Sequence, residues 1–155
     1  MWILVADSSR ARIFDATRKF SSPGEFEFSE FSEVDDLVNA RGRARNQDID
    51  TDKPGRMVDK TSAGAGGGQR SAVGGKEEPK ETEAKAFAQR VGDHLQQGLN
   101  DNSFDELVVI AAPKFLGMLR DAIPSQVKSK VVEEISKDFT KMSEHDLQGR
   151  LPELL

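Results

Sequence analysis

The sequence predicts an α/β domain built on one mixed β-sheet. Two continuous apolar runs, Trp2–Ala6 and residues 106–112, are typical of buried central strands. Residues 25–31 alternate charged and aromatic side chains, which is typical of a strand with one buried face. Apolar residues recur every three or four positions from residue 81 to residue 99, which predicts a long amphipathic helix. The chain of 155 residues has the size of one layered domain with a single core.

The first part of the chain is predicted to form three strands. Trp2–Ala6 is followed by a turn at residues 7–9 and by an alternating segment at residues 10–16, so the two segments are expected to pair as a hairpin. A second turn at residues 22–24 precedes the strand at residues 25–31, whose phenylalanines are expected in the core. The first turn, Asp-Ser-Ser, also stands at the carboxyl end of a central strand. A small polar site there is the alternative to a plain turn.

The second half alternates helices and strands. After the long helix and the second buried strand, a short amphipathic helix is expected to stop at Pro124. Residues 131–135 are predicted to form a strand, and residues 126–130 are the segment that leads into it. A last helix is expected to begin with Ser143 as its N-cap. The resulting order is three strands, a long loop, then helix, strand, helix, strand and helix. It is typical of an α/β layered domain with a mixed sheet.

The loop at about residues 38–80 shows no apolar periodicity. A structureless segment of this length inside a compact domain is usually functional or disordered, and we expect it to be mobile in the isolated protein. The chain has a net charge of −5, yet residues 41–76 hold eight basic and four acidic side chains. That window therefore carries +4, and the rest of the chain carries −9. A basic loop in an acidic chain suits contact with phosphates, and a solvated loop with scattered charges is the alternative.

Within this loop, residues 61–75 are rich in glycine and hold one side-chain amide, that of Gln69. Because glycine has no Cβ, such a loop lets bare backbone N–H groups come close to a bulky ligand. Gly67-Gly68-Gln69 resembles the GGQ tripeptide with which translation release factors hydrolyse peptidyl-tRNA. The alternative is a flexible linker with a fortuitous glutamine.

The composition argues against several kinds of site. The chain has no cysteine, so neither a disulfide nor a thiolate metal site is available. His94 and His145 stand far apart without a nearby ligand pattern, so we expect no metal site and no cofactor. The first apolar run is too short for a signal peptide, and no segment approaches the length of a membrane span. We therefore expect a soluble cytoplasmic protein.

Several motifs, in this order along the chain, resemble those of the bacterial host attachment protein family. They are Thr51-Asp52-Lys53-Pro54-Gly55-Arg56, Arg70-Ser71-Ala72-Val73, residues 104–113, Leu116-Gly117-Met118-Leu119-Arg120 and residues 132–140. Family members are described as required for attachment to host cells. Their domain is similar to the middle, GGQ-bearing domain of archaeal and eukaryotic class 1 release factors. The resemblance therefore implies a ribonuclease H-like fold with a long, mobile, glycine-rich loop.

This resemblance also implies a reaction at the ribosome, the hydrolysis of the ester that joins a peptide to tRNA. Gly67 and Gly68 would shape the loop, and Gln69 would be catalytic. The backbone N–H of Gln69 would stabilise the oxyanion, and its side chain would position the attacking water. Basic residues of the loop would contact RNA phosphates. These residues are Arg41, Arg43, Arg45, Arg56, Lys60, Arg70 and Lys76.

Three functions are therefore open, and whether the protein is an enzyme is open with them. The first is a peptidyl-tRNA hydrolase that acts on the ribosome and tRNA without reading a codon. The second is a non-catalytic module that binds RNA or a protein through the basic loop. The third is a factor that is needed, indirectly, for attachment to host cells. The sequence does not set the oligomeric state.

Overall fold

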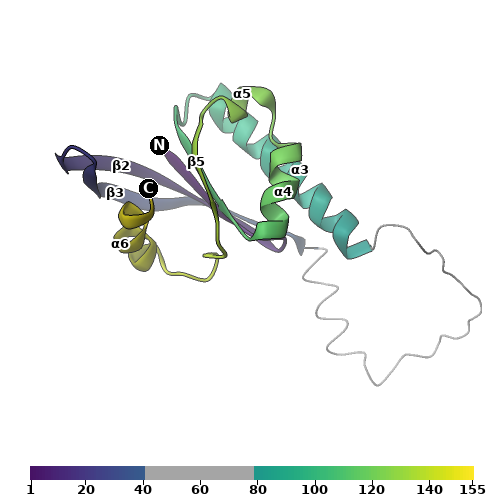
Figure 1. Cartoon of the computed structure of the whole chain (residues 1–155). Helices are drawn as coiled ribbons and strands as arrows, with labels where there is room; N and C mark the ends of the chain where they lie inside the picture. The colour runs from purple at the N-terminus through teal and green to yellow at the C-terminus, as the bar shows by residue number, and fades with distance from the viewer. Residues whose placement is uncertain (41–78) are drawn as a thin grey trace, which may run out of the picture.

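The computed structural model describes residues 1–40 and 79–155 (Figure 1). The glycine-rich loop, with every predicted catalytic and RNA-binding residue, falls in residues 41–78 and so lies outside the described residues. The described chain forms a five-stranded mixed sheet with helices on both of its faces. The predicted α/β class with a mixed sheet is confirmed.

The sheet has the strand order β3-β2-β1-β4-β5. β1 lies in the middle, where it pairs antiparallel with β2 and parallel with β4, and β4 is in turn parallel with β5. The carboxyl ends of three strands, β1, β4 and β5, therefore meet at one end of the sheet. The strands are β1 (Trp2–Ala6), β2 (Arg10–Ser22), β3 (Glu25–Val38), β4 (Leu107–Ala111) and β5 (Val131–Ser136).

β1 is fully apolar because both of its faces are covered. Successive side chains of a strand point to opposite faces, so β1 contributes Leu4 to the core cluster on one face and Ile3 and Val5 to the cluster on the other. All three side chains are completely buried. β4, with the sequence LVVIA, is buried along its whole length in the same way.

The helices form one layer on each face of the sheet (Figure 1). α3 (Pro79–Asn100) and α4 (Pro113–Ala122) cover one face, and the short α5 (Ser125–Lys128) follows them where the sequence predicts only an approach to β5. α6 (Glu144–Leu154) covers the other face, against β3. No helix within residues 1–40 and 79–155 is both long and apolar enough to cross a membrane.

The β2–β3 hairpin is longer than predicted. The sequence predicts that these strands end at Ala16 and Phe31, whereas β2 runs to Ser22 and β3 to Val38. Except for the exposed Phe20, the additional residues of β2 are polar, and so are most of those of β3. Nearly all of them stay partly or fully exposed, so they carry little periodicity. They are strand because all but Ser21 and Val34 pair with a residue across the hairpin.

A bulge keeps the phenylalanines of β3 on one face. Arg18 pairs with Phe28 and Thr17 with Glu30, so Ser29 is an extra residue in the ladder. The ring centroids of Phe28 and Phe31 consequently lie 5.2 Å apart, and both side chains are buried, as predicted. Phe26 is only half-buried, because it lies toward the tip of the hairpin.

Candidate ligand-binding cleft at the carboxyl ends of the parallel strands

A cleft of about 430 Å³ opens where β1 and β4 end. The turn after β1, the first turns of α3 and α4, and the segment after β5 surround it. In open α/β sheets, ligands bind at the carboxyl ends of the strands, so this is where the fold favours a site. The polar side chains that line the cleft are Asp7, Ser8, Lys80, Glu81, Lys114 and Asp138.

Asp7 closes the turn that follows β1. Its Oδ1 accepts hydrogen bonds from the backbone N–H groups of Ser9 (2.8 Å) and Arg10 (2.9 Å). Such bonds from the backbone to an aspartate side chain stabilise tight turns. The predicted turn at residues 7–9 is therefore confirmed, and the same aspartate also lines the cleft.

Thr140 brings the segment after β5 to this turn. Its buried hydroxyl oxygen lies 3.1 Å from Oδ2 of Asp7 and 2.8 Å from Oδ1 of Asp138. A hydroxyl carries one hydrogen, so it donates to one of the two carboxylates at a time. Thr140 thus holds two carboxylates next to each other in the acidic part of the lining.

Arg12 in turn fixes Thr140. Its guanidinium donates hydrogen bonds to the carbonyl oxygens of Thr140 (3.0 Å) and Met142, and it forms an ion pair with Glu33 (2.9 Å). Arg12 is only 6% exposed, so its donors must be satisfied inside the protein. An arginine of β2 therefore anchors the connection from β5 to α6, and with it the acidic part of the cleft.

Lysines supply the basic part of the lining. Nζ of Lys114 lies 3.9 Å from one carboxylate oxygen of Glu81, and Nζ of Lys85 lies 4.0 Å from the other. Lys80 is exposed and forms no ion pair within the described residues. Phe115 and Met118 add apolar surface to the same cleft. The lining therefore suits a ligand that joins a charged group to an apolar body.

The residues predicted from the sequence to be catalytic, Gly67, Gly68 and Gln69, lie outside the described residues, and so do all the predicted RNA contacts. Both flanks of this loop are described. On the upstream side, Asn39 donates its backbone N–H to the carbonyl oxygen of Ser9 (2.9 Å) and its side-chain amide to that of Ser8 (3.0 Å). On the downstream side, Lys80 lines the cleft. The chain therefore enters and leaves residues 41–78 beside the cleft.

The two histidines lie on different helices. Nε2 of His94 is 3.1 Å from Oδ2 of Asp35, and its ring stacks on Trp2 with the ring centroids 6.4 Å apart. His145 lies in the first turn of α6. In the two described ranges of the chain, no group of three or more acidic or histidine side chains is placed to hold a metal ion.

Sequence reasoning missed Asp138, which lines the cleft, and also Thr140 and Arg12, which hold the segment that carries it. The sequence does contain a signal for Asp138, because this aspartate comes shortly after the strand β5, as Asp7 comes directly after β1. Because parallel strands end at the same side of a sheet, two such aspartates are expected to meet there. No comparable signal identifies Arg12, which lies 128 residues from the Thr140 carbonyl that it binds.

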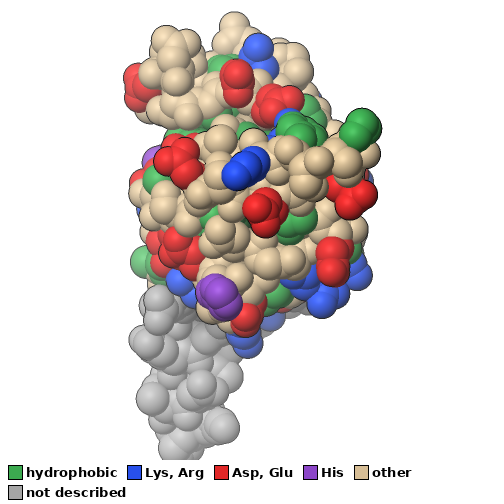
Figure 2. Space-filling view, turned by 90° about the vertical axis from the view of Figure 1, so that its left-hand side faces the viewer, with side chains coloured by type: hydrophobic (Ala, Val, Ile, Leu, Met, Phe, Trp, Pro, Cys, Tyr) green, Lys and Arg blue, Asp and Glu red, His purple; other side chains and the backbone are tan. Residues whose placement is uncertain are grey.

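Acidic and basic side chains are interspersed on the face that carries the hairpin and α6 (Figure 2). The part of this face formed by described residues shows no continuous patch of one sign. A positive field would steer a polyanion such as RNA to the surface, and this face has no continuous positive patch among its described residues that would supply one.

The pattern of a family described as "Protein required for attachment to host cells" matches residues 2–151. An uncharacterized protein of Rickettsia prowazekii (strain Madrid E) is 38% identical over 64 residues, which are 40% of this chain and 43% of that protein. The match thus spans less than half the length of this curated relative. Because the family pattern covers nearly the whole chain, the protein belongs to the family of proteins required for attachment to host cells.

Proposed function

We propose that the protein supports attachment to host cells as a binding module, with the cleft at the ends of β1 and β4 as its ligand site. The observation that carries this proposal is the family match over residues 2–151. The cleft is the part of the fold that combines charges of both signs with apolar surface at the carboxyl ends of parallel strands.

The test is a gene deletion complemented with cleft variants. Lys80→Ala with Lys114→Ala removes the basic lining and keeps the core intact, because both side chains are exposed. Lys141→Ala, an exposed lysine outside the cleft lining, is the matched control. We expect deletion to lower the number of attached cells, and the wild type and the control to restore it. The double variant, produced at the same level, should fail to restore attachment.

Two results contradict this proposal at different levels. Normal attachment after deletion would refute the role in attachment itself. Full restoration by the double lysine variant would keep that role and remove the cleft as the binding site. Thermal unfolding of the purified proteins separates loss of binding from loss of folding. The double lysine variant and the Lys141→Ala control should both unfold at the same temperature as the wild type.

A second candidate is codon-independent hydrolysis of peptidyl-tRNA through Gly67-Gly68-Gln69. It is supported by the flanks of the loop, since Asn39 binds the carbonyl oxygen of the cleft residue Ser8 and Lys80 lines the cleft itself. The two glycines would let the loop enter a narrow site, and the backbone N–H of Gln69 would stabilise the oxyanion. Its side-chain amide would orient the attacking water.

In this second proposal the protein acts in the cytoplasm on the ribosome and tRNA. The basic residues of the loop would bind RNA phosphates. These residues are Arg41, Arg43, Arg45, Arg56, Lys60, Arg70 and Lys76. Neither a metal ion nor a cofactor takes part in the proposed step.

Release of labelled peptide from stalled ribosomes tests this chemistry. Gln69→Ala should abolish release and leave co-sedimentation with ribosomes unchanged. Replacing Arg56 and Arg70 together should weaken co-sedimentation, with a shallower salt dependence than in the wild type. Co-sedimentation without release by the wild type would indicate a non-catalytic binding module. If the wild type neither releases peptide nor binds ribosomes, the second candidate is wrong and the attachment role stands alone.

A further inference from the structure

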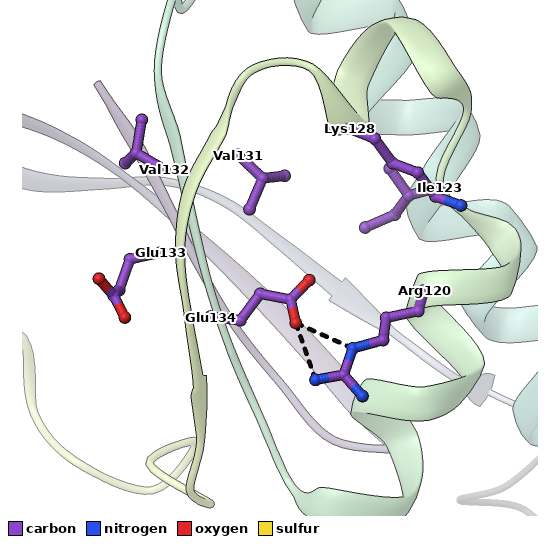
Figure 3. Close-up of a pocket in the computed structure, with 7 residues that line it drawn as sticks. All are labelled: Arg120, Ile123, Lys128, Val131, Val132, Glu133 and Glu134. Carbon is purple, nitrogen blue, oxygen red and sulfur yellow. Dashed lines mark hydrogen bonds and ion pairs between the residues drawn. The ribbon is translucent and has the colours of Figure 1, made fainter.

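Opposite charges are arranged differently in two hollows of the protein. In a hollow of about 560 Å³ beside β5, two opposite charges that face each other are paired. Arg120 of α4 points toward Glu134 of β5, and its Nε and Nη2 each lie 2.8 Å from Oε1 of the glutamate (Figure 3). The cleft at the ends of β1 and β4 also holds both signs of charge, but its aspartates are not paired with its lysines. The cleft therefore keeps both signs available to a ligand.

The acidic side of the cleft consists of Asp7 and Asp138. Neither forms an ion pair with any side chain that the structure describes. The hydroxyl of Thr140 lies within hydrogen-bond distance of both carboxylates, and its single hydrogen can serve only one of them at a time. Because two neighbouring carboxylates repel each other, this side of the cleft favours a cationic group.

The basic side of the cleft consists of Lys80 and Lys114, in the first turns of α3 and α4. Lys80 forms no ion pair within residues 1–40 and 79–155. Lys114 shares one carboxylate, that of Glu81, with Lys85, at 3.9 and 4.0 Å. The N-cap of α4, Ala112, makes no side-chain hydrogen bond to the helix, so the first backbone N–H groups of α4 add to the positive potential. This side of the cleft therefore favours an anionic group.

The remaining lining of the cleft is apolar. Phe115 and Ala84 are buried and Met118 is half-buried, and all three contribute surface to the cleft. Its volume of about 430 Å³ is that of a small-molecule site, since such sites measure roughly 300–1,000 Å³. A ligand that matches all parts of the lining carries an ammonium at one end, a carboxylate at the other and apolar groups between. A free amino acid holds both charges on one carbon, whereas a short peptide separates them.

We propose that the cleft binds a short apolar peptide with free ends. The inference rests on the proposed function, because it takes the same cleft as the ligand site and adds the chemical class of the ligand. The terminal ammonium of the peptide lies against Asp7 and Asp138. The terminal carboxylate lies against Lys80 and Lys114, and an apolar side chain contacts Phe115.

The experiment titrates the isotope-labelled full chain with leucyl-leucine and follows amide chemical shifts by NMR. Two matched probes each lack one charge, since N-acetyl-leucyl-leucine has no ammonium and leucyl-leucine amide has no carboxylate. We expect shifts to change around Asp7 and Lys80 and to stay the same around Lys128, which lies at the other hollow. Removal of either terminal charge should weaken binding about tenfold, because hydrogen bonds to charged groups are the stronger ones.

Two variants assign each end of the peptide to one side of the cleft. Asp138→Asn removes a charge and keeps the oxygen that accepts the hydrogen bonds of Thr140. It should weaken binding of leucyl-leucine about three- to tenfold and leave binding of the acetylated peptide unchanged. Lys80→Gln should weaken binding of leucyl-leucine to a similar extent and leave binding of the amide unchanged. Asp105→Asn and Lys128→Gln, at exposed positions outside the lining, are the controls and should change neither.

Three results would overturn the proposal. The first is no change of chemical shift with leucyl-leucine, which would refute this ligand class and leave the attachment role to be decided by complementation. The second is equal binding of leucyl-leucine and of either probe that lacks a charge, because that end of the peptide would then not be recognised. The third is an equal weakening of all three probes by Asp138→Asn or Lys80→Gln, which would indicate an effect on the fold and not a contact with one terminal charge.

Discussion

The two faces of the sheet are attached to their helices in different ways. On the α3–α4 face, backbones approach closely at glycines: a Cβ on Gly92 would lie 2.7 Å from the carbonyl oxygen of Ala122, and one on Gly98 would lie 2.5 Å from the ring of Trp2. On the other face, α6 buries Leu147 and Leu151, and the connection that leads to it is held by hydrogen bonds from Arg12.

This difference indicates which changes each face tolerates. A close-packed apolar contact is sensitive to added atoms, because interior side chains leave few gaps. A polar anchor is sensitive to lost hydrogen bonds, because each buried partner left behind keeps its desolvation penalty. The cleft lies where both kinds of contact meet, since α3 and α4 supply its lysines and the anchored segment supplies Asp138.

Arg12→Ala should have the largest effect. Arg12 is 6% exposed, and its loss leaves Glu33 and the carbonyl oxygens of Thr140 and Met142 without this donor. We expect the free energy of unfolding in urea to fall by about 2–4 kcal/mol, somewhat less than for a fully buried pair because Glu33 is partly exposed.

Arg10→Ala is the matched control on the same strand. Arg10 also pairs with a carboxylate of β3, and its hydrogen bond to Asp36 raises the pKa of the guanidinium. Both side chains are well exposed, 41% and 38%, so the loss should stay below about 1 kcal/mol. Equal losses for the two arginine variants would show that the connection to α6 does not depend on its anchor.

Gly92→Ala tests the opposite face and should have the next largest effect. The new Cβ meets a backbone oxygen, which cannot move aside like a flexible side chain. We expect a net loss of about 1–2 kcal/mol, because overpacking outweighs the gain of up to about 1 kcal/mol in helix propensity. Gly117→Ala is the control within α4, since no atom lies within 4 Å of its Cβ position. Thermal unfolding should show Gly117→Ala to be slightly stabilised, and stabilisation of both variants would contradict the close contact between α3 and α4.

The elements of this fold were largely predictable because each carries its own local pattern. β1 and β4 are continuous apolar runs, α3 has an apolar stripe, and Ser143 caps α6 by accepting a hydrogen bond from the backbone N–H of Asp146 (3.0 Å), as predicted. The length of the hairpin was not predictable in this way. Its outer part is held by pairing across the two strands, and register shifts interrupt the alternation that marks a strand in sequence.

The cleft was predictable only in part. Asp7 is visible in the sequence because it directly follows a buried strand. Arg12 and Thr140 are not, because their roles depend on contacts across 128 and 133 residues that no local pattern encodes. Lys80 and Lys114 resemble any other lysine in a first helical turn until the ends of β1 and β4 bring them together.

The smallest predicted effect is that of Thr140→Val, beside the acidic part of the cleft. Thr140→Val keeps the shape of a buried side chain and removes the hydroxyl shared by Asp7 and Asp138. We expect a loss of about 1 kcal/mol, since one hydrogen bond disappears and the partly exposed carboxylates can turn to water. Thr17→Val removes a hydroxyl that donates to Glu30 (3.0 Å) at an exposed hairpin position, so it should change the stability by no more than about 0.5 kcal/mol. Urea unfolding of both variants measures the difference. If the two losses are equal, Thr140 contributes no more than a surface threonine, and the acidic part of the cleft is held by Arg12 alone.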